Sequence, residues 1–568
     1  MKASDYIIAE LRRRGVRCVF EMSGGMIAHL LDSLGKQRFV QPITTHHEQA
    51  AAFAAEGMAR ATGIPGVAMA TSGPGATNLL TGVGSCYFDS IPVVFITGQV
   101  NLYEQKGSKK VRQAGFQETD IVSMARPITK MARMIRSARE LPQALDEAFR
   151  AATEGRPGPV LLDIPMNVQK EELSPRALRP SRIRPFHGRA PSLSTALDRL
   201  QSMLDRSARP LILAGGGIRS GNASQLFRAF ARRSGIPVAC SLLGVDAFPH
   251  TTPQFVGMIG SYGNRYANFA VAEADFILVL GSRLDVRQTG SNPAAFGSGK
   301  TIAHVDVDPS EINHRVKGCV AIRASINDFL TQAIRAGIRA NKKVLLPWKA
   351  RINEWKHRYP CQNELNDVKG INPNLFLLKL GRMAAPDTLY VSDVGQHQMW
   401  AAQSLPIGAR QRFLTSGGMG AMGFGLPCAI GASLSNKRRP IVVIAGDGGF
   451  QTNIHELQTV MRNRLPLKMV LLNNRSHGMV RQFQQSYFAS RFQSTVLGYS
   501  CPDFVKVALA YGIPAWHIRQ PSEMERALRT LFRQSGPVLL EVAISIKANA
   551  YPKMLFGQTL KEMEPVLG

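Results

Sequence analysis

The 568-residue sequence has no run of about 18 or more apolar residues, so it offers no segment that could span a bilayer as a helix. It has only seven cysteines, which lie far apart and form no CxxC pair, so a disulfide framework is excluded. The first 16 residues also lack the apolar core of a secretory signal, because Glu10 and three arginines interrupt them. We therefore expect a folded cytoplasmic protein that is neither membrane-spanning nor disordered.

Acidic residues are also scarce, because 40 Asp and Glu stand against 69 Lys and Arg, a net charge of +29. Such a balance creates a positive field that attracts anions, so a nucleic-acid partner has to be considered. The basic residues, however, form short scattered clusters without a basic helix or an interleaved aromatic stripe. We therefore expect no nucleic-acid partner but a basic surface that favours anionic substrates.

Short β-branched runs alternate with helical patterns three times along the chain, which is typical of parallel sheets covered by helices on both faces. This pattern predicts an α/β protein with three doubly wound parallel-sheet domains. A basic, proline-rich segment and a polar helical segment separate the domains. The expected division is a first domain at 1–170, a linker at 171–191, a middle domain at 192–345, a linker at 346–370 and a third domain at 371–568.

Two polar motifs follow two predicted strands of the third domain. They are GDG at 446–448 and the pair Asn473 and Asn474, separated by 24 residues. Asp447 and Asn474 would supply the oxygen ligands that Mg²⁺ prefers. The glycines would let a diphosphate approach the backbone, and a helix beginning near Asn453 would offer unpaired amides to its charge. A tight turn with a capping aspartate would look similar, but the two motifs at this spacing favour a metal site.

The segment around these motifs, GDGGFQTNIHELQTVMRNRLPLKMVLLNN, resembles the thiamine-diphosphate motif, and the wider chain resembles the acetolactate synthase family. The similarity runs through THHEQAAAFAAEGMAR (45–60), TSGPGATNLLTG (71–82), SDVGQHQMWAAQ (392–403), GGMGAMGFGLPCAIGA (417–432) and HGMVRQFQ (477–484). The resemblance implies pyrimidine-binding, central FAD-binding and diphosphate-binding domains, in that order. It also implies a homodimer or dimer of dimers with active sites at the subunit interface, because in that family Glu48 and the Asp447 site belong to different subunits.

The resemblance assigns thiamine diphosphate and Mg²⁺ to the third domain, with the carbonyl of Ser476 as the third metal ligand beside Asp447 and Asn474. The residues expected to contact this cofactor are Val394, Gly395, Gln396, His397, Gly420, Met422, Gly446, Asp447, Gly448, Gly449, Asn474, Ser476, His477, Gly478 and Met479.

Five residues are expected to take part in catalysis by the same resemblance: Glu48, Gly24, Gly25, Gln117 and Met422. Glu48 matches the glutamate that shares a proton with N1′ of the aminopyrimidine, and Met422 matches the residue that supports the bent cofactor. By itself, a glutamate at the start of a helix would be explained by the helix dipole. For the two glycines and Gln117, an ordinary loop role remains the alternative.

The middle domain is expected to bind FAD, with a structural rather than a redox role. The matching positions are Gly215, Gly216, Gly217, Leu242, Leu243, Gly281, Ser282, Arg283, Asp285, Arg287, Asp306 and Val307. Glycine-ended strands admit a dinucleotide backbone, and arginines meet its diphosphate. One segment at 257–268, GMIGSYGNRYAN, departs from the family pattern, since it is longer and lacks a histidine.

Several substitutions fall where the family contacts the second substrate. Phe483 replaces a tryptophan, and the expected acceptor pocket consists of Met479, Phe483, Arg287 and Phe116. The pattern resembles the flavin-dependent sugar-branching enzymes of the yersiniose type, which implies transfer of a pyruvate-derived two-carbon unit to a nucleotide-linked 4-keto-deoxysugar. The retained Arg287, Met479 and Lys130 leave acetolactate synthase, with pyruvate as its own acceptor, as the alternative. A noncatalytic basic binding protein is a third, different class.

Overall fold

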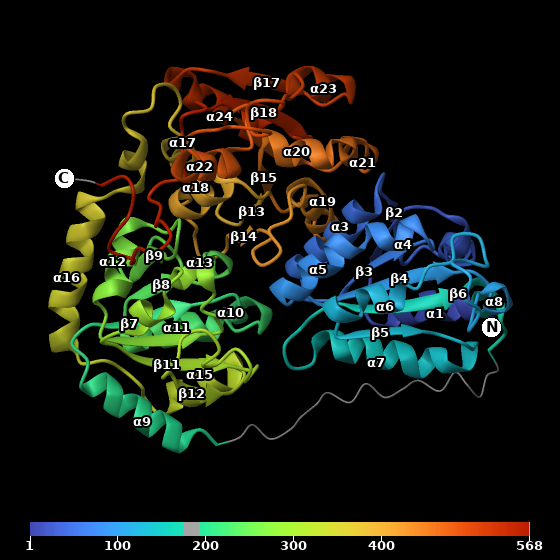
Figure 1. Ribbon diagram of the computed structural model, residues 1–568, viewed down its shortest axis with the longest axis horizontal. Coiled ribbons are helices and arrows are strands. Elements are labelled where there is room, and N and C mark those ends of the chain that lie inside the picture. The colour runs from blue at the N-terminus through green and yellow to red at the C-terminus, as the bar shows by residue number, and fades with distance from the viewer. Residues whose placement is uncertain (174–191, 567–568) are drawn as a thin grey trace.

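The computed structural model describes residues 1–173 and 192–566, so most of the expected linker at 171–191 lies outside the described residues. The chain forms three six-stranded sheets whose strand pairs are all parallel, each with helices packed around it (Figure 1). The predicted α/β class with three parallel-sheet domains is therefore confirmed. Among the described helices, none is long and apolar enough to cross a membrane.

The first sheet has the strand order β2-β1-β3-β4-β6-β5. Its strands are β1 (Cys18–Glu21), β2 (Gln41–Thr44), β3 (Gly66–Ala70), β4 (Val93–Gln99), β5 (Met131–Met134) and β6 (Val160–Pro165). The helices of this domain are α1 (Ala3–Arg13), α2 (Ala28–Gly35), α3 (Glu48–Thr62), α4 (Pro74–Asn78), α5 (Leu80–Asp89), α6 (Ile121–Ala125), α7 (Leu141–Thr153) and α8 (Met166–Lys170). The three central strands β3, β4 and β6 are buried along their whole length, as expected for parallel strands covered on both faces.

The middle sheet has the order β12-β11-β10-β7-β8-β9. Its strands are β7 (Pro210–Ala214), β8 (Val238–Cys240), β9 (Phe255–Met258), β10 (Phe276–Leu280), β11 (Thr301–Asp306) and β12 (Val320–Arg323). The helices are α9 (Ser194–Asp205), α10 (Gly217–Ser220), α11 (Ser224–Ser234), α12 (Arg265–Glu273), α13 (Val286–Thr289), α14 (Pro293–Gly297) and α15 (Ile326–Arg335). The chain changes direction along the sheet between β7 and β10, which is where open α/β sheets bind ligands.

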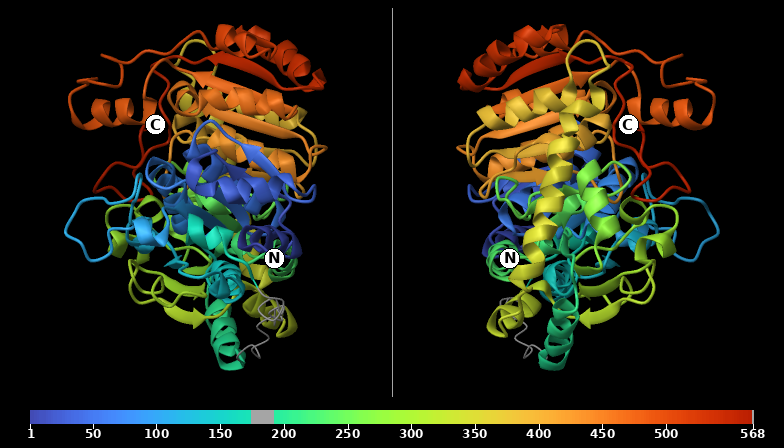
Figure 2. Two further views of the ribbon diagram at one scale, coloured as in Figure 1. Left: turned by 90° about the vertical axis from the view of Figure 1, so that its right-hand side faces the viewer. Right: turned by 90° about the vertical axis from the view of Figure 1, so that its left-hand side faces the viewer.

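The third sheet has the order β14-β13-β15-β16-β18-β17 and lies above the other two domains (Figures 1 and 2). Its strands are β13 (Leu389–Ser392), β14 (Arg412–Leu414), β15 (Ile441–Gly446), β16 (Leu467–Asn473), β17 (Ala515–Ile518) and β18 (Val538–Ala543). Its helices are α17 (Pro373–Met383), α18 (Gln396–Ser404), α19 (Gly425–Ser435), α20 (Asp447–Thr452), α21 (Leu457–Arg462), α22 (Gly478–Tyr487), α23 (Phe504–Ala510) and α24 (Met524–Arg533).

Two helices rich in small residues join the first domain to the third. A Cβ on Gly57 of α3 would overlap the carbonyl oxygen of Cys428 in α19, and a Cβ on Gly431 of α19 would overlap that of Ala54. The two helices therefore touch backbone to backbone, which only glycine permits at these positions. This contact fixes α3, and with it Glu48 at its first turn, against the third domain.

The helix α16 (Lys342–Arg358) covers most of the segment that we expected to be a linker at 346–370. Its buried side chains are Leu345, Trp348, Ile352 and Trp355, a helical spacing that forms one apolar stripe. This stripe packs on the middle domain, where the Trp348 indole N–H donates to the Pro210 carbonyl at 3.0 Å. The C-terminal segment also returns to the middle domain, since Met554, Leu560 and Met563 join the same core.

Candidate active site

A cavity opens at the carboxyl ends of β13, β15 and β16. Its described lining comes from the third domain alone: Val394, Gly395, Gln396, His397, Trp400, Met422, Gly446, Asp447, Gly448, Gly449, Leu472, Asn474, Ser476, His477, Gly478, Met479, Val480, Gln493, Ser494 and Thr495. We call it the third-domain cavity. Every residue that we expected to contact thiamine diphosphate lines it except Gly420, which lies in the loop before Met422.

The two polar motifs lie side by side because their strands are neighbours. In the parallel pair formed by β15 and β16, Gly446 is opposite Leu472, so Asp447 and Asn474 follow the same edge of the sheet. The helix α20 begins directly at Asp447. A helical turn begins directly after Asn453, as expected, but α20 precedes it, so the first amides after the strand end belong to α20.

Asp447 is a buried carboxylate, and burial raises its pKa to about 6. The hydroxyl of Tyr499 donates to its Oδ2 at 2.7 Å. No Lys, Arg or His pairs with it in the described part of the chain. A cation bound at this edge would therefore stabilise the ionised form of Asp447.

The surroundings of Asp447 suit Mg²⁺ and a diphosphate. The described residues contain no group of three or more His, Cys, Asp or Glu side chains that could hold a metal ion, so a cation here needs amide, carbonyl and phosphate oxygens as well. Buried polar atoms without a hydrogen-bond partner, Ser476 Oγ and His397 Nε2, belong to residues that line the cavity. A Cβ on Gly448 would lie 2.7 Å from His477 Nδ1, so only glycine leaves this part of the cavity open.

Neighbouring side chains hold the second motif in place. The amide of Asn474 donates to Gln396 Oε1 at 2.9 Å, and its Oδ1 accepts the backbone N–H of Ser476 at 3.2 Å. A Cβ on Gly478 would overlap Gln396 Oε1. These contacts link the end of β16 to the start of α18, which brings the expected residues 394–397 and 474–479 to one cavity wall.

The catalytic residues expected in the first domain gather around a different feature, the turn at 71–75. Asn78 donates to Glu48 Oε2 at 3.0 Å, and a Cβ on Gly75 would lie 3.2 Å from Glu48 Oε1. Glu48 is buried, and it forms no ion pair with any Lys, Arg or His of the described residues. Its carboxylate is therefore held by an amide and lies against a glycine of the turn.

The same turn contacts the two other first-domain segments that we singled out. A Cβ on Gly24 would overlap the side chain of Thr71, and a Cβ on Gly73 would lie 2.9 Å from the Cβ of Gln117. Gln117 has a positive φ of 64°, while Gly25 opens onto free space. The structure thus brings Gly24, Glu48 and Gln117 together at one turn. None of them, nor Gly25, lines the third-domain cavity of the same chain.

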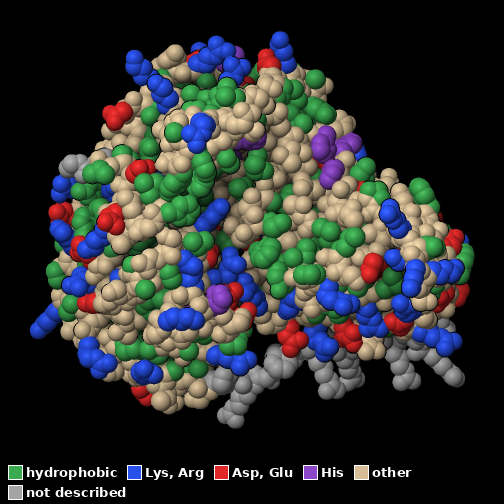
Figure 3. Space-filling view, viewed as in Figure 1, with side chains coloured by type: hydrophobic (Ala, Val, Ile, Leu, Met, Phe, Trp, Pro, Cys, Tyr) green, Lys and Arg blue, Asp and Glu red, His purple; other side chains and the backbone are tan. Residues whose placement is uncertain are grey.

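A second cavity lies between the domains, and we call it the middle cavity. Its lining includes these expected FAD residues: Gly216, Gly217, Leu242, Leu243, Gly281, Ser282, Arg283, Asp285, Arg287, Asp306 and Val307. Gly215 lies beneath them, since a Cβ there would overlap the Gly281 carbonyl oxygen. The segment at 257–268 that departs from the family pattern also lines this cavity, through Met258, Ile259, Ser261 and Tyr262. Figure 3 shows Lys and Arg side chains in the hollow between the middle and first domains.

Sequence analysis missed the contributions of the other two domains to the middle cavity. They are Phe88, Asp89, Ser90, Gly155, Arg156 and Pro157 from the first domain, and Met399 and Gly417 from the third. Arg156 pairs with Asp308 at 3.2 Å and with Glu311 at 2.6 Å, so it ties the first domain to the middle one. The sequence offered one signal for Arg156, because it lies in the segment GRPGPV, whose glycines and prolines are typical of a turn.

The structure does not bring the residues expected to contact an acceptor into one pocket, since only Met479 and Arg287 line a cavity, and each lines a different one. Met479 lines the third-domain cavity, and Arg287 lines the middle cavity. Phe483 packs against Tyr487, with 4.7 Å between ring centroids. Phe116 is 78% exposed and lines neither cavity, and Lys130 lines neither and donates to the Glu154 carbonyl.

Known protein families resemble this chain in all three domains. Three models of the thiamine pyrophosphate enzymes match: the N-terminal TPP binding domain at 1–124, the central domain at 197–333 and the C-terminal TPP binding domain at 393–542. The chain is 37% identical over 567 residues to the acetolactate synthase isozyme 2 large subunit of Escherichia coli (strain K12), covering 99% of each chain.

Two further relatives cover nearly the whole chain. The acetolactate synthase large subunit of Parasynechococcus marenigrum (strain WH8102) is 37% identical over 560 residues, covering 97% of this chain and 89% of the relative. That of Lactococcus lactis subsp. lactis (strain IL1403) is 35% identical over 560 residues, covering 99% and 95%. None of these three relatives is named for a sugar-branching reaction.

Proposed function

Because the chain belongs to the acetolactate synthase-like family of thiamine-diphosphate enzymes, we propose that it decarboxylates pyruvate and joins the remaining two-carbon unit to a second pyruvate. The observation that carries this proposal is the third-domain cavity, where Asp447 and Asn474 meet at one sheet edge inside a family match that covers the whole chain. Pyruvate replaces the ketosugar as the favoured acceptor, because the relatives are named for acetolactate formation.

In this proposal the third-domain cavity holds thiamine diphosphate and Mg²⁺. Asp447, the amide oxygen of Asn474 and the carbonyl of Ser476 would hold the metal ion, whose remaining ligands would be diphosphate and water oxygens. When bound, thiamine diphosphate supplies the nucleophilic carbon and the electron sink that decarboxylation requires. Met422 and Met479 would give the bound cofactor an apolar wall.

Glu48 is the proposed proton-sharing group, and it reaches the site from a second copy of the chain. The support is geometric, since the Glu48 carboxylate lies against the turn at 71–75 and lines no part of its own chain's third-domain cavity. A single chain would therefore lack a complete site, and we infer at least a homodimer. Gly24, Gly25 and Gln117 would then face the reacting carbonyl from the same second copy.

The middle cavity is the proposed FAD site. Arg283 and Arg287 would meet the diphosphate, and the close packing of Gly217 against the backbone of Gly281 leaves room for a dinucleotide backbone. The first, middle and third domains would thus carry the pyrimidine-binding, FAD-binding and diphosphate-binding roles. The proposed FAD needs no redox role, because the two-carbon transfer is redox-neutral.

One observation keeps the nucleotide-linked ketosugar as a second candidate acceptor. Phe483, Tyr487 and Phe556 form a cluster of partly exposed rings, with 6.1 Å between the centroids of Phe483 and Phe556. Such faces can stack on a nucleotide base, and the net positive charge would favour its diphosphate.

A product assay separates the two acceptors. Purified protein receives thiamine diphosphate, Mg²⁺, FAD and pyruvate, with and without a nucleotide-linked 4-keto-6-deoxysugar, and products are identified by mass spectrometry. Acetolactate as the main product in both reactions supports the proposal. A sugar heavier by one acetaldehyde unit, formed in preference to acetolactate, would replace pyruvate by the sugar as acceptor. Omission of thiamine diphosphate is the control and should abolish both products.

A further inference from the structure

The middle cavity and the third-domain cavity share two pieces of wall. On α18, Met399 lines the middle cavity, whereas the next residue, Trp400, lines the third-domain cavity. On the loop at 415–423, Gly417 lines the middle cavity and Met422 lines the third-domain cavity. A ligand in either cavity therefore rests on the same helix and the same loop.

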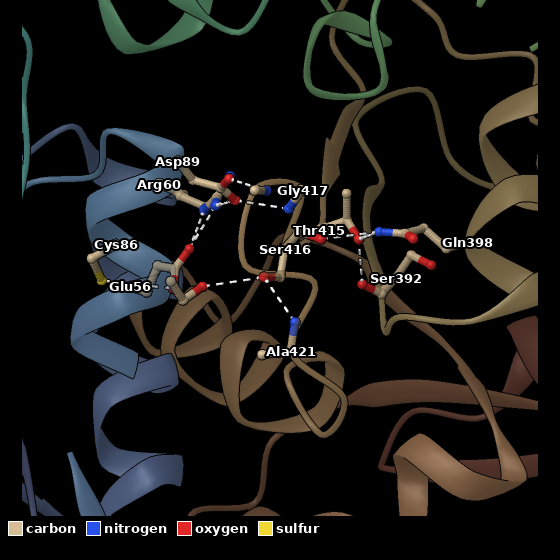
Figure 4. Close-up of polar contacts among 12 residues, drawn as sticks. Glu56, Arg60, Cys86, Asp89, Ser392, Gln398, Thr415, Ser416, Gly417 and Ala421 are labelled. Carbon is tan, nitrogen blue, oxygen red and sulfur yellow. Dashed lines mark hydrogen bonds and ion pairs between the residues drawn. The ribbon is translucent and has the colours of Figure 1, made fainter. Parts of the chain in front are cut away.

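A buried carboxylate of the first domain binds the N-terminal part of this loop. Asp89, at the end of α5, accepts the backbone N–H of Gly417 at 2.9 Å and that of Gly418 at 2.7 Å (Figure 4). Asp89 itself lines the middle cavity beside Gly417. It is thus the side chain that joins the lining of one cavity to the loop that leads to the other.

Asp89 is in turn oriented by α3. The guanidinium of Arg60 donates to Asp89 at 2.7 Å and to Glu56 at 2.6 Å, and all three side chains are buried (Figure 4). Arg60 can bridge the two carboxylates because its planar head presents several donors at once. Arg60 therefore holds Asp89 in place, and the position of Asp89 determines the position of the loop.

The hydrogen bonds continue along the loop toward Met422. The hydroxyl of Ser416 lies 3.3 Å from that of Ser85 in α5, and it accepts the backbone N–H of Ala421 at 3.3 Å. The neighbouring Met422 reaches over the α20 turn, where its Cε would lie 3.2 Å from a Cβ on Gly448. Hydrogen bonds and chain neighbours therefore connect the Asp89 contact with Met422, which lies beside Gly448.

We propose that Asp89 is a positioning residue that couples the two cavities, so that a dinucleotide in the middle cavity strengthens cofactor binding in the third-domain cavity. The identities of the two ligands, FAD and thiamine diphosphate, rest on the proposed function. A dinucleotide that contacts Asp89 and Gly417 fixes the loop, and the fixed loop holds Met422 in place before the second ligand arrives. The effect is reciprocal, because coupling free energies between two sites are equal in both directions.

Binding measurements test the coupling without relying on turnover. The full-length protein, freed of cofactors by dialysis, is titrated with thiamine diphosphate in Mg²⁺, with and without saturating FAD. Quenching of tryptophan fluorescence reports binding, since Trp400 lines the third-domain cavity. We expect FAD to tighten thiamine diphosphate binding by about 5- to 150-fold in the wild type. In Asp89→Asn this ratio should fall to about 1, because the amide cannot accept from Arg60 and both glycine amides as the carboxylate does.

Two variants make the result specific. Glu10→Gln removes another buried carboxylate of the first domain, one that pairs with Arg13 of α1 and with Arg14 at its C-terminal cap and lines neither cavity, and it should keep the wild-type ratio. Ser416→Ala removes the acceptor of the Ala421 amide and should reduce the ratio even if Asp89→Asn fails to fold. The exchange rate of the cofactor's C2 proton, measured by NMR with both ligands bound, should also fall in Ser416→Ala.

A ratio near 1 in the wild type, no binding of FAD to the wild type, or an unchanged ratio in a folded Asp89→Asn would overturn the proposal. If Asp89→Asn does not fold, an unchanged ratio in Ser416→Ala would overturn it. If the ratio falls as far in Glu10→Gln as in Asp89→Asn, the specific role of Asp89 is overturned. The product assay on the wild type is independent of these titrations. A carboligase without coupling would therefore be distinguished from a protein that binds both ligands and makes no product.

Discussion

The two cavities differ in how many parts of the chain build them. All described lining residues of the third-domain cavity lie between 394 and 495, mostly in short motifs that follow β13, β15 and β16. The middle cavity takes its lining from all three domains, from Phe88 to Gly417. The third-domain cavity can thus be predicted from local motifs at strand ends. The middle cavity depends on how domains far apart in the sequence pack, and only a middle cavity built this way can carry the coupling proposed above.

The largest expected effect tests whether the first domain supplies a catalytic group to the third-domain cavity. Glu48→Gln should lower kcat by about 10²- to 10⁴-fold, because an amide cannot share a proton with the cofactor as a carboxyl does. The dissociation constant for thiamine diphosphate should stay within a few fold. Steady-state kinetics and fluorescence titration measure the two quantities, with Glu10→Gln as the control for losing a buried carboxylate. Unchanged turnover would remove Glu48 from the mechanism.

The next effect tests whether the two cavities bind different ligands. Asp447→Ala should weaken thiamine diphosphate binding in Mg²⁺ by at least about 100-fold, since even residues that only orient metal ligands change affinity by about 10- to 100-fold. FAD binding, measured alone by flavin fluorescence, should not change. Asp503→Ala, an exposed helix cap of the same domain, is the control and should affect neither ligand. A matching loss of FAD would mean that the cavities are one site.

A smaller effect tests the contribution of the first domain to the middle cavity. Arg156→Ala should weaken FAD binding by about tenfold or more, because Arg156 lines the middle cavity and a hydrogen bond to a charged group contributes about 1.5 to 3 kcal/mol. Arg351→Ala, which breaks an exposed pair on α16, is the matched control. If Arg156→Ala binds FAD like the wild type, the cavity does not need the first domain.

The last effect is on stability rather than on ligand binding, and it concerns a carboxyl that lines neither cavity. Burial raises the pKa of Asp163 to about 7, although Thr97 and Gln99 donate to its carboxyl. A carboxyl with a raised folded-state pKa stabilises the fold while protonated, so this contribution is complete below about pH 3.8 and is lost as pH rises through about 7. The wild type should therefore lose about 1.4 kcal/mol per pH unit across this window from this group, relative to Asp163→Asn.

Urea unfolding at several pH values measures this difference. Curves for the wild type and Asp163→Asn that run parallel between about pH 4 and 7 would contradict the raised pKa. Ligand affinities at fixed pH should be the same in both proteins, since Asp163 is absent from both linings.

Sequence alone predicted the parts of the molecule that depend on neighbours along the chain. The strand that ends at Gly446 and the strand that ends at Asn473 carry buried β-branched and apolar runs, so their ends and the motifs after them could be located. The parallel pairing of these strands then put Asp447 and Asn474 at one edge. Glu48 was found through family resemblance, because a buried helix-start glutamate alone has an ordinary explanation.

Other features depend on contacts that no local pattern encodes. Tyr499 follows an irregular segment, and its role arises only where its hydroxyl meets Asp447. Arg156 and Asp89 belong to the first domain but line the middle cavity, which requires knowing how the domains pack. The segment of α16 was expected to be helical, but its sequence did not show that the apolar stripe from Leu345 to Trp355 packs on the middle domain.

The most direct test of the central claim is the balance of the reaction. Purified protein with thiamine diphosphate, Mg²⁺ and FAD is given pyruvate, and pyruvate consumed, carbon dioxide released and acetolactate formed are measured together. We predict two molecules of pyruvate consumed for each carbon dioxide and each acetolactate, and no reaction without thiamine diphosphate. One pyruvate per carbon dioxide with acetaldehyde or acetate as product, or no consumption at all, would contradict the assignment as a carboligase.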